Sequence, residues 1–153
     1  MKNMKSRFLI LFVFIISNVI SARNDHCPFA AGIMIGDPTG ISLKMQSKGG
    51  HALAGGMGWS MGKNAHLNLH MDFLKYHSII VTPEDRKFLF YYGIGSRIRI
   101  EDESRLGIRF PLGINYRFRS APFETFFELV PVFDLAPETS TDLGAGIGIR
   151  YCF

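Results

Sequence analysis

Four polar side chains with metal-binding potential stand at alternate positions of one short segment: His66, Asn68, His70 and Asp72. Alternate residues of a strand share a face, and at roughly 3.3 Å per residue the two histidines would lie about 13 Å apart. Metal–nitrogen bonds are only about 2 Å long, so one zinc ion cannot bind both. The pattern favours hydrogen bonding, and we expect neither a metal nor another cofactor.

Three other motifs lack a part that their chemistry requires. The segment 58–64 is one residue too short for a phosphate-binding loop, and Asn64 replaces the Ser or Thr that binds magnesium. The alternating glycines at 144–148 precede no helix, so they do not indicate a dinucleotide loop. His77 and Ser78 would point to opposite faces of a strand, whereas an activated serine needs its base beside it. We therefore expect no catalysis.

A larger set of charged and polar residues recurs with strand periodicity and carries both signs of charge. Charges inside a protein must be paired. We therefore predict an interior polar network made of Lys44, His70, Asp72, Arg97, Arg99, Arg109, Arg117, Glu124, Glu128, Asp134 and Arg150.

The elements that would position these residues are short strands. Apolar and polar residues alternate between turn-rich separators, and no convincing helix follows residue 22. The pattern predicts strands at about 29–36, 41–47, 51–61, 65–76, 88–100, 105–118, 123–135 and 142–153. Six of these reach the roughly 9–11 residues that a tilted strand needs to cross a bilayer. The predicted fold is all-β, an eight-stranded antiparallel up-and-down barrel.

The apolar faces of these strands are predicted to point outward. The polar faces are rich in glycine and alanine, which suit the interior of a narrow barrel better than a solvated surface. Aromatic residues fall near one rim, as in an interfacial girdle: Phe29, Phe73, Phe88, Phe90, Tyr116, Phe118, Phe123, Tyr151 and Phe153. Both features favour a transmembrane barrel with a filled polar interior and no open pore. The alternative is a soluble periplasmic lipocalin-like barrel that carries an apolar ligand.

Residues 1–22 have the pattern of a cleaved signal peptide. Lys2, Lys5 and Arg7 precede an apolar run at 8–16 and small residues before a cleavage point after Ser21 or Ala22. A membrane anchor is the alternative, but the run is shorter than the roughly 20 residues of a spanning helix. Cleavage removes three of the 17 Lys+Arg and none of the 13 Asp+Glu, so the net charge falls from +4 to +1 in the barrel domain, 23–153. This small excess gives no support for a nucleic-acid partner.

Cys27 and Cys152 lie near the two ends of the exported part. Export places them in an oxidising compartment, and barrel closure would bring the first and last strands together. We predict a disulfide or a near contact between them. Two cysteines alone do not make a zinc site.

The segments 36–42 (GDPTGIS), 109–113 (RFPLG) and 148–153 (GIRYCF) carry a family resemblance. Over residues 28–153 the chain resembles small OmpX- and OmpA-type outer-membrane barrels, close to OmpX-like barrels of unassigned function. The resemblance implies outer-membrane localisation, with membrane lipid and the barrel-assembly machinery as partners. It also implies an assembly signal in Ile147, Ile149, Tyr151 and Phe153.

The resemblance implies a structural or surface-interaction role and leaves an extracellular ligand open. A lipid-modifying barrel enzyme is less favoured because the chain lacks the His-x-Ser pair of lipid A deacylases. Two features depart from the family pattern. The longest predicted connection, 77–87, falls on the periplasmic side, and Pro111 and Pro131 stand in the middle of predicted strands.

The turns also predict which interior residues face one another. The RSAP turn at 119–122 places Phe118 opposite Phe123, and therefore Arg117 opposite Glu124. The connection at 136–141 places Glu128 opposite Arg150. Both pairings would set opposite charges side by side on neighbouring strands.

Overall fold

The computed structural model describes residues 27–60, 66–79, 87–118 and 120–153. In chain order it contains β1 (Phe29–Gly36), β2 (Gly40–Gln46), β3 (His51–Ser60), β4 (His66–Ile79), β5 (Lys87–Ile100), β6 (Arg105–Arg109), β7 (Leu112–Arg117), β8 (Phe123–Ala136) and β9 (Ser140–Cys152). Over these ranges, no helix has the length and apolar character needed to span a membrane. The predicted signal peptide, residues 1–22, lies outside them.

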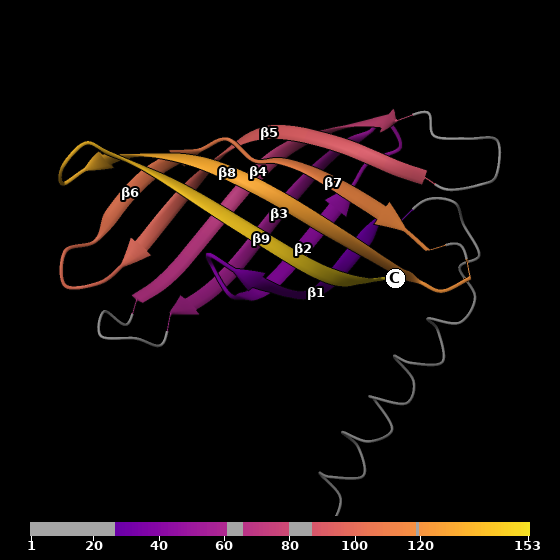
Figure 1. Ribbon diagram of the computed structural model, residues 1–153, viewed down its shortest axis with the longest axis horizontal. Helices are drawn as coiled ribbons and strands as arrows, with labels where there is room; N and C mark the ends of the chain where they lie inside the picture. Colours follow the sequence, from indigo (N-terminus) through magenta and orange to yellow (C-terminus); the bar gives the residue numbers. More distant parts are fainter. Residues whose placement is uncertain (1–26, 61–65, 80–86, 119) are drawn as a thin grey trace, which may run out of the picture.

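The strands form one antiparallel sheet that closes into a ring (Figure 1). Neighbours in the chain pair with each other from β1 to β5, and β8 pairs with β9. Closure comes from the pairing of β1 with β9, in which Ala30 faces Cys152 and Gly36 faces Gly146. The predicted all-β antiparallel architecture is confirmed.

The segment expected as a single strand at 105–118 is divided into β6 and β7. Both pair with β5 on one side and β8 on the other, so they share one place in the ring. The interruption falls at Phe110 and Pro111, where proline has no amide hydrogen to donate. The ring stays closed there because Phe110 N donates to Pro131 O at 2.9 Å and Gly93 N donates to Pro111 O at 3.0 Å. Pro131 itself remains within β8, opposite Leu143.

The predicted boundary of the fourth strand was wrong. It continues to Ile79, and His77 and Ser78 pair with Phe90 and Leu89 instead of opening a loop. The fourth connection is therefore shorter than the expected 77–87, and its residues 80–86 lie outside the described ranges.

The ring has two distinct ends. Cys27, the C-terminal Phe153 and the turn 47–50 lie at one end, which we call the terminal rim (Figure 1). The connections 37–39, 101–104 and 137–139 lie at the other end, the far rim.

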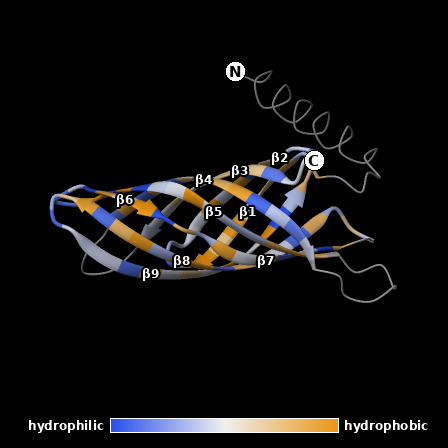
Figure 2. Ribbon diagram, turned by 90° about the horizontal axis from the view of Figure 1, so that it is seen from above, coloured by the Kyte–Doolittle hydropathy of each residue, from blue (hydrophilic) through white to orange (hydrophobic). Residues whose placement is uncertain are grey.

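Side chains alternate between the interior and the outer face, with the apolar ones outside. In β9, Leu143 and Ile147 are 66% and 60% exposed, whereas Arg150 is buried. In β2, Leu43 and Met45 are exposed on either side of the fully buried Lys44. Figure 2 shows the resulting alternation of hydrophobic and hydrophilic residues along the strands. The outward orientation of the apolar faces is as predicted.

Aromatic rings gather at the terminal rim, where the sequence predicts an interfacial girdle. The Phe153 ring lies 5.5 Å from Phe29 and 5.0 Å from Tyr151, between ring centroids, and Tyr151 lies 5.2 Å from Phe123. Phe88 on β5 contacts Tyr116 on β7, and Tyr116 contacts Phe118, which directly follows β7. These rings therefore lie along the part of the rim formed by β5, β7, β8, β9 and β1, and they cross the β1–β9 junction.

Candidate functional site

The charged residues of the inward faces form the candidate site. Of the predicted network, three side chains (His70, Arg99 and Arg117) are half-buried. The others are buried: Lys44, Asp72, Arg97, Arg109, Glu124, Glu128, Asp134 and Arg150. The alternation of short strands places them inside because residues two apart share a face. Their ion pairs divide into three levels between the terminal rim and the far rim.

The level nearest the terminal rim is centred on Glu124 of β8. Its carboxylate accepts a hydrogen bond from Lys44 Nζ and lies 3.3 Å from Arg150 Nη1 and 3.6 Å from Arg117 Nη2. Glu124 and Lys44 are both fully shielded from solvent. One carboxylate therefore joins cations from β2, β7 and β9.

Packing against rings and a hydroxyl completes this level. Arg150 donates from Nε and Nη2 to Ser42 Oγ, at 3.0 and 2.9 Å, and its guanidinium lies 3.7 Å from the centroid of the Phe126 ring. Lys44 Nζ lies 5.3 Å from the Tyr76 ring centroid. Cation–π contacts of this kind stabilise charges that have left water.

The middle level is centred on Arg109. Its Nε lies 3.0 Å from Asp72 Oδ1 and its Nη2 lies 3.4 Å from Glu128 Oε1. The Tyr91 hydroxyl donates to the other Glu128 oxygen at 3.0 Å. These contacts join β6 to β4 and β8, and all four side chains are buried.

The level nearest the far rim contains two arginines and two aspartates. Arg97 pairs with Asp134 at 2.8 Å and with Asp142 at 3.1 Å, and Arg99 pairs with Asp142 at 3.2 Å. Ser140 Oγ donates to Asp134 at 3.4 Å. This level ties β5 to β8 and β9.

One of the two predicted interior pairings is present and the other is wrong. Arg117 lies opposite Glu124, as the RSAP turn indicates. Arg150 lies opposite Glu124, and Glu128 lies opposite Gly146, so the expected Glu128–Arg150 pair is absent. The cause is the place of the turn: β8 and β9 pair as far as Asp134 opposite Ser140, so the turn is centred on Pro137, whereas the predicted pairing centres it near residue 139. A displacement of two residues in the centre of the turn moves every β9 partner by four residues, so Glu128 faces Gly146 and not Arg150.

Several interior residues were missed in the sequence. Asp142 was placed only as the first residue of a strand, although it holds both far-rim arginines. Ser42 and Tyr91 were overlooked because one is small and the other aromatic. The signal that could have found them is spacing, since Ser42 is two residues from Lys44 and Tyr91 is six from Arg97 on the same inward face.

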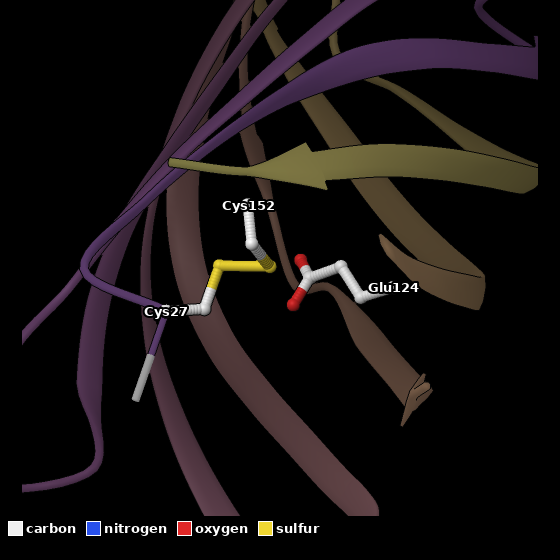
Figure 3. Close-up of side chains that lie close together, drawn as sticks. All are labelled: Cys27, Glu124 and Cys152. Carbon is white, nitrogen blue, oxygen red and sulfur yellow. A yellow bond between two sulfur atoms is a disulfide. The ribbon is translucent and has the colours of Figure 1, made fainter. Parts of the chain in front are cut away.

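Cys27 and Cys152 form a disulfide at the terminal rim, with their Cα atoms 5.4 Å apart. Figure 3 shows the Glu124 carboxylate beside this bond. The two sulfur atoms and a Glu124 oxygen lie within 4.8 Å of one another, the spacing of a metal site. The bonded sulfurs offer no thiolate, however, and Glu124 already binds three cations. The disulfide closes the ring covalently, and while it is formed the cluster provides no metal ligands.

Comparison with known proteins gives a fold but no family. No family model matches the chain, and no curated protein matches it. Among solved structures, it is similar to the N-terminal β-barrel domain of Pseudomonas aeruginosa OprF, with a TM-score of 0.58 and 15% sequence identity. The alignment covers 82% of this chain and 95% of the OprF domain. At this identity the likeness concerns the β-barrel architecture.

Proposed function

We propose that the chain is an eight-stranded transmembrane β-barrel of the outer membrane, with β6 and β7 as two parts of one strand. Its role is structural, with no catalytic activity and no open pore. The observation that carries this proposal is the inverted distribution of side chains, with charges inside and large apolar residues outside.

The outer face suits a lipid environment. Exposed apolar residues occur on every side of the ring, for example Ile33 on β1, Met71 on β4, Ile94 on β5 and Leu135 on β8, each more than half exposed. Monomeric soluble proteins rarely expose continuous apolar surface of this kind, whereas a lipid-facing barrel requires it. The fold likeness to the OprF barrel domain agrees with this environment.

The soluble alternative is disfavoured by the interior. A lipocalin-like carrier needs an apolar cavity, but here Lys44, Arg109 and Glu124 fill the inward face with paired charges. The same interior disfavours a lipid-modifying enzyme that draws an acyl chain inside. Because the ion pairs lie at three levels along the axis, a hydrated path for ions would have to break each level in turn.

The connections favour a structural role over binding by surface loops. In outer-membrane barrels the termini face the periplasm and the long loops face outward. With that orientation the described far-rim connections, 37–39, 101–104 and 137–139, would be exposed to the outside, and each is short. Export by residues 1–22 and recognition of the C-terminal Phe153 by the assembly machinery belong to the same proposal.

Fractionation of the expressed full-length chain tests the proposal. We expect recovery in the outer-membrane pellet, and faster migration in SDS gels for unheated than for boiled protein. Non-reducing and reducing gels should both be run, so that a change in migration caused by the disulfide is not mistaken for one caused by the folded barrel. Recovery from the periplasmic extract, without heat-dependent migration, would instead support the soluble carrier.

A further inference from the structure

A patch of basic side chains lies on the outer face at the terminal rim. It consists of His51 at the start of β3 and of Lys75 and His77 on β4, which we call the basic patch. Lys75 and His77 are exposed and His51 is half-exposed. None of these three side chains belongs to the interior network.

The strand register places the three groups within one small area. Lys75 lies directly opposite His51, and such cross-strand neighbours have Cβ atoms about 4.5–5.5 Å apart. His77 follows Lys75 by two residues on the same face, a rise of roughly 6.6 Å. A phosphate group between them could accept hydrogen bonds from the ammonium group and from an N–H of each imidazole.

Aromatic rings hold the histidines in place. His51 stacks on Phe73 with 5.7 Å between centroids, and His77 stacks on Tyr92 with 5.5 Å between centroids and an interplanar angle of 7°. One step toward the middle of the barrel, the outer face becomes apolar, with Phe73 between its partners Leu53 and Ile94. A ligand seated here would have its charged end on the basic patch and an apolar part along these residues.

Among the residues that the structure describes, the charges of the outer surface favour an anionic ligand at this rim. Among the described residues, every Asp or Glu outside the three ion-pair levels belongs to the far-rim region: Asp37, Glu101, Asp102, Glu103 and Glu138. The terminal rim carries the basic patch and Lys48 in the turn 47–50. No described carboxylate therefore competes with a phosphate at the basic patch.

We propose that the basic patch binds the headgroup of an anionic phospholipid, with an acyl chain lying along Phe73, Leu53 and Ile94. This inference rests on the proposed function, because it places the patch at the membrane interface. The apolar residues beside the patch distinguish a phospholipid from free phosphate.

Native mass spectrometry of the folded full-length barrel in mild detergent tests the site. Phosphatidylglycerol and phosphatidylcholine of equal acyl length are titrated separately. We expect the wild type to bind phosphatidylglycerol more tightly than phosphatidylcholine. Lys75→Gln should reduce this preference by about fivefold. This factor corresponds to about 1 kcal/mol, the contribution of one lysine at an anionic surface. The triple variant His51→Gln, Lys75→Gln, His77→Gln should show no preference. The control is Arg105→Gln, which removes an exposed cation from the far end of β6.

Four results would overturn the inference, and the last of them is a folded wild-type barrel without lipid preference. The preference could survive in the triple variant, Arg105→Gln could reduce it as much as Lys75→Gln does, or excess inorganic phosphate could displace the lipid, which would indicate a phosphate site. Heat-dependent migration is measured on each sample first. A wild-type chain that forms no barrel in lipid would overturn the proposed function itself, whereas a folded wild-type barrel without lipid preference would overturn only this inference.

Discussion

At the scale of single residues, the interior depends on one carboxylate shared by several cations. Glu124 is fully buried, and it contacts Lys44, Arg117 and Arg150. A buried ion pair is costly to form but more costly to break from one side, because the remaining charge then has no partner. Glu124 is therefore the residue whose neutralisation should disturb the terminal-rim level most.

We predict that Glu124→Gln, which keeps the shape of the side chain, lowers the free energy of unfolding by about 3–5 kcal/mol, the usual cost of breaking a buried pair. Urea unfolding of the barrel in lipid vesicles, followed by the loss of the faster-migrating form, measures it. The control is Glu138→Gln in the connection between β8 and β9, where the side chain is exposed. Equal unfolding midpoints for the two variants would contradict a central role for Glu124.

Glycine positions provide a second prediction, because inward and outward glycines have different surroundings. A Cβ at Gly113 would collide with the Tyr91 ring and lie 2.6 Å from Phe127 O, whereas one at Gly55 would meet only His70 O at 3.4 Å. Gly113→Ala should therefore lower stability by about 1–3 kcal/mol, as overpacking does, and Gly55→Ala should change it much less. The same urea assay compares the two variants, and a Gly113→Ala variant as stable as Gly55→Ala would show that both the Tyr91 ring and the Phe127 carbonyl move without cost.

The individual interior residues could largely be predicted from the sequence because strand periodicity has only two faces. Once one charged residue of a strand is placed inside, the residues two, four or six positions away must point inside as well. Tyr91 and Asp142 were missed for different reasons. An aromatic side chain does not indicate a polar interior, and the partners of Asp142 depend on the register between strands distant in sequence.

At the scale of elements, register could be predicted where the turn was correctly located. The RSAP turn fixed β7 against β8 and gave the Arg117–Glu124 pairing. The β8–β9 register was wrong because the turn is centred on Pro137, between the paired residues Asp134 and Ser140, and not near residue 139 as predicted. Strand ends carry little hydrophobic signal, so their extent is set by pairing across the sheet.

The β1–β9 junction provides a prediction at this scale. The disulfide joins residues that are 125 apart in sequence, so it strongly restricts the unfolded chain. We predict that Cys27→Ser with Cys152→Ser lowers the free energy of unfolding by about 2–5 kcal/mol while the barrel still folds. Wild-type protein treated with reductant is the matched comparison, and its free energy of unfolding should fall by the same amount. If neither the double variant nor the reduced wild type loses stability, strand pairing alone holds the β1–β9 junction.

At the scale of the whole molecule, the orientation of the two faces could be predicted, although composition alone does not decide it. Glycine and alanine on the polar face indicated a narrow interior, and the aromatic residues indicated a rim. The division between β6 and β7 could not be located, because Pro111 and Pro131 look equivalent in sequence. Only Pro111 interrupts pairing, while Pro131 stays within β8.

The last prediction concerns ion conduction through the complete barrel. The three levels of ion pairs lie in series, and Arg97 at the far rim, Arg109 in the middle and Glu124 at the terminal rim each belong to a different level. We predict no stable single-channel steps for the wild-type barrel in planar bilayers, since the proposed eight-stranded barrel would leave space only for side chains. Arg97→Ala should also stay closed, because it removes two of the three ion pairs of the far-rim level and leaves the other two levels intact. Insertion is verified by heat-dependent migration of protein recovered from the same vesicles. Steady conductance of the wild type would contradict a filled interior, whereas conductance of Arg97→Ala alone would mean that the far-rim level is the whole barrier.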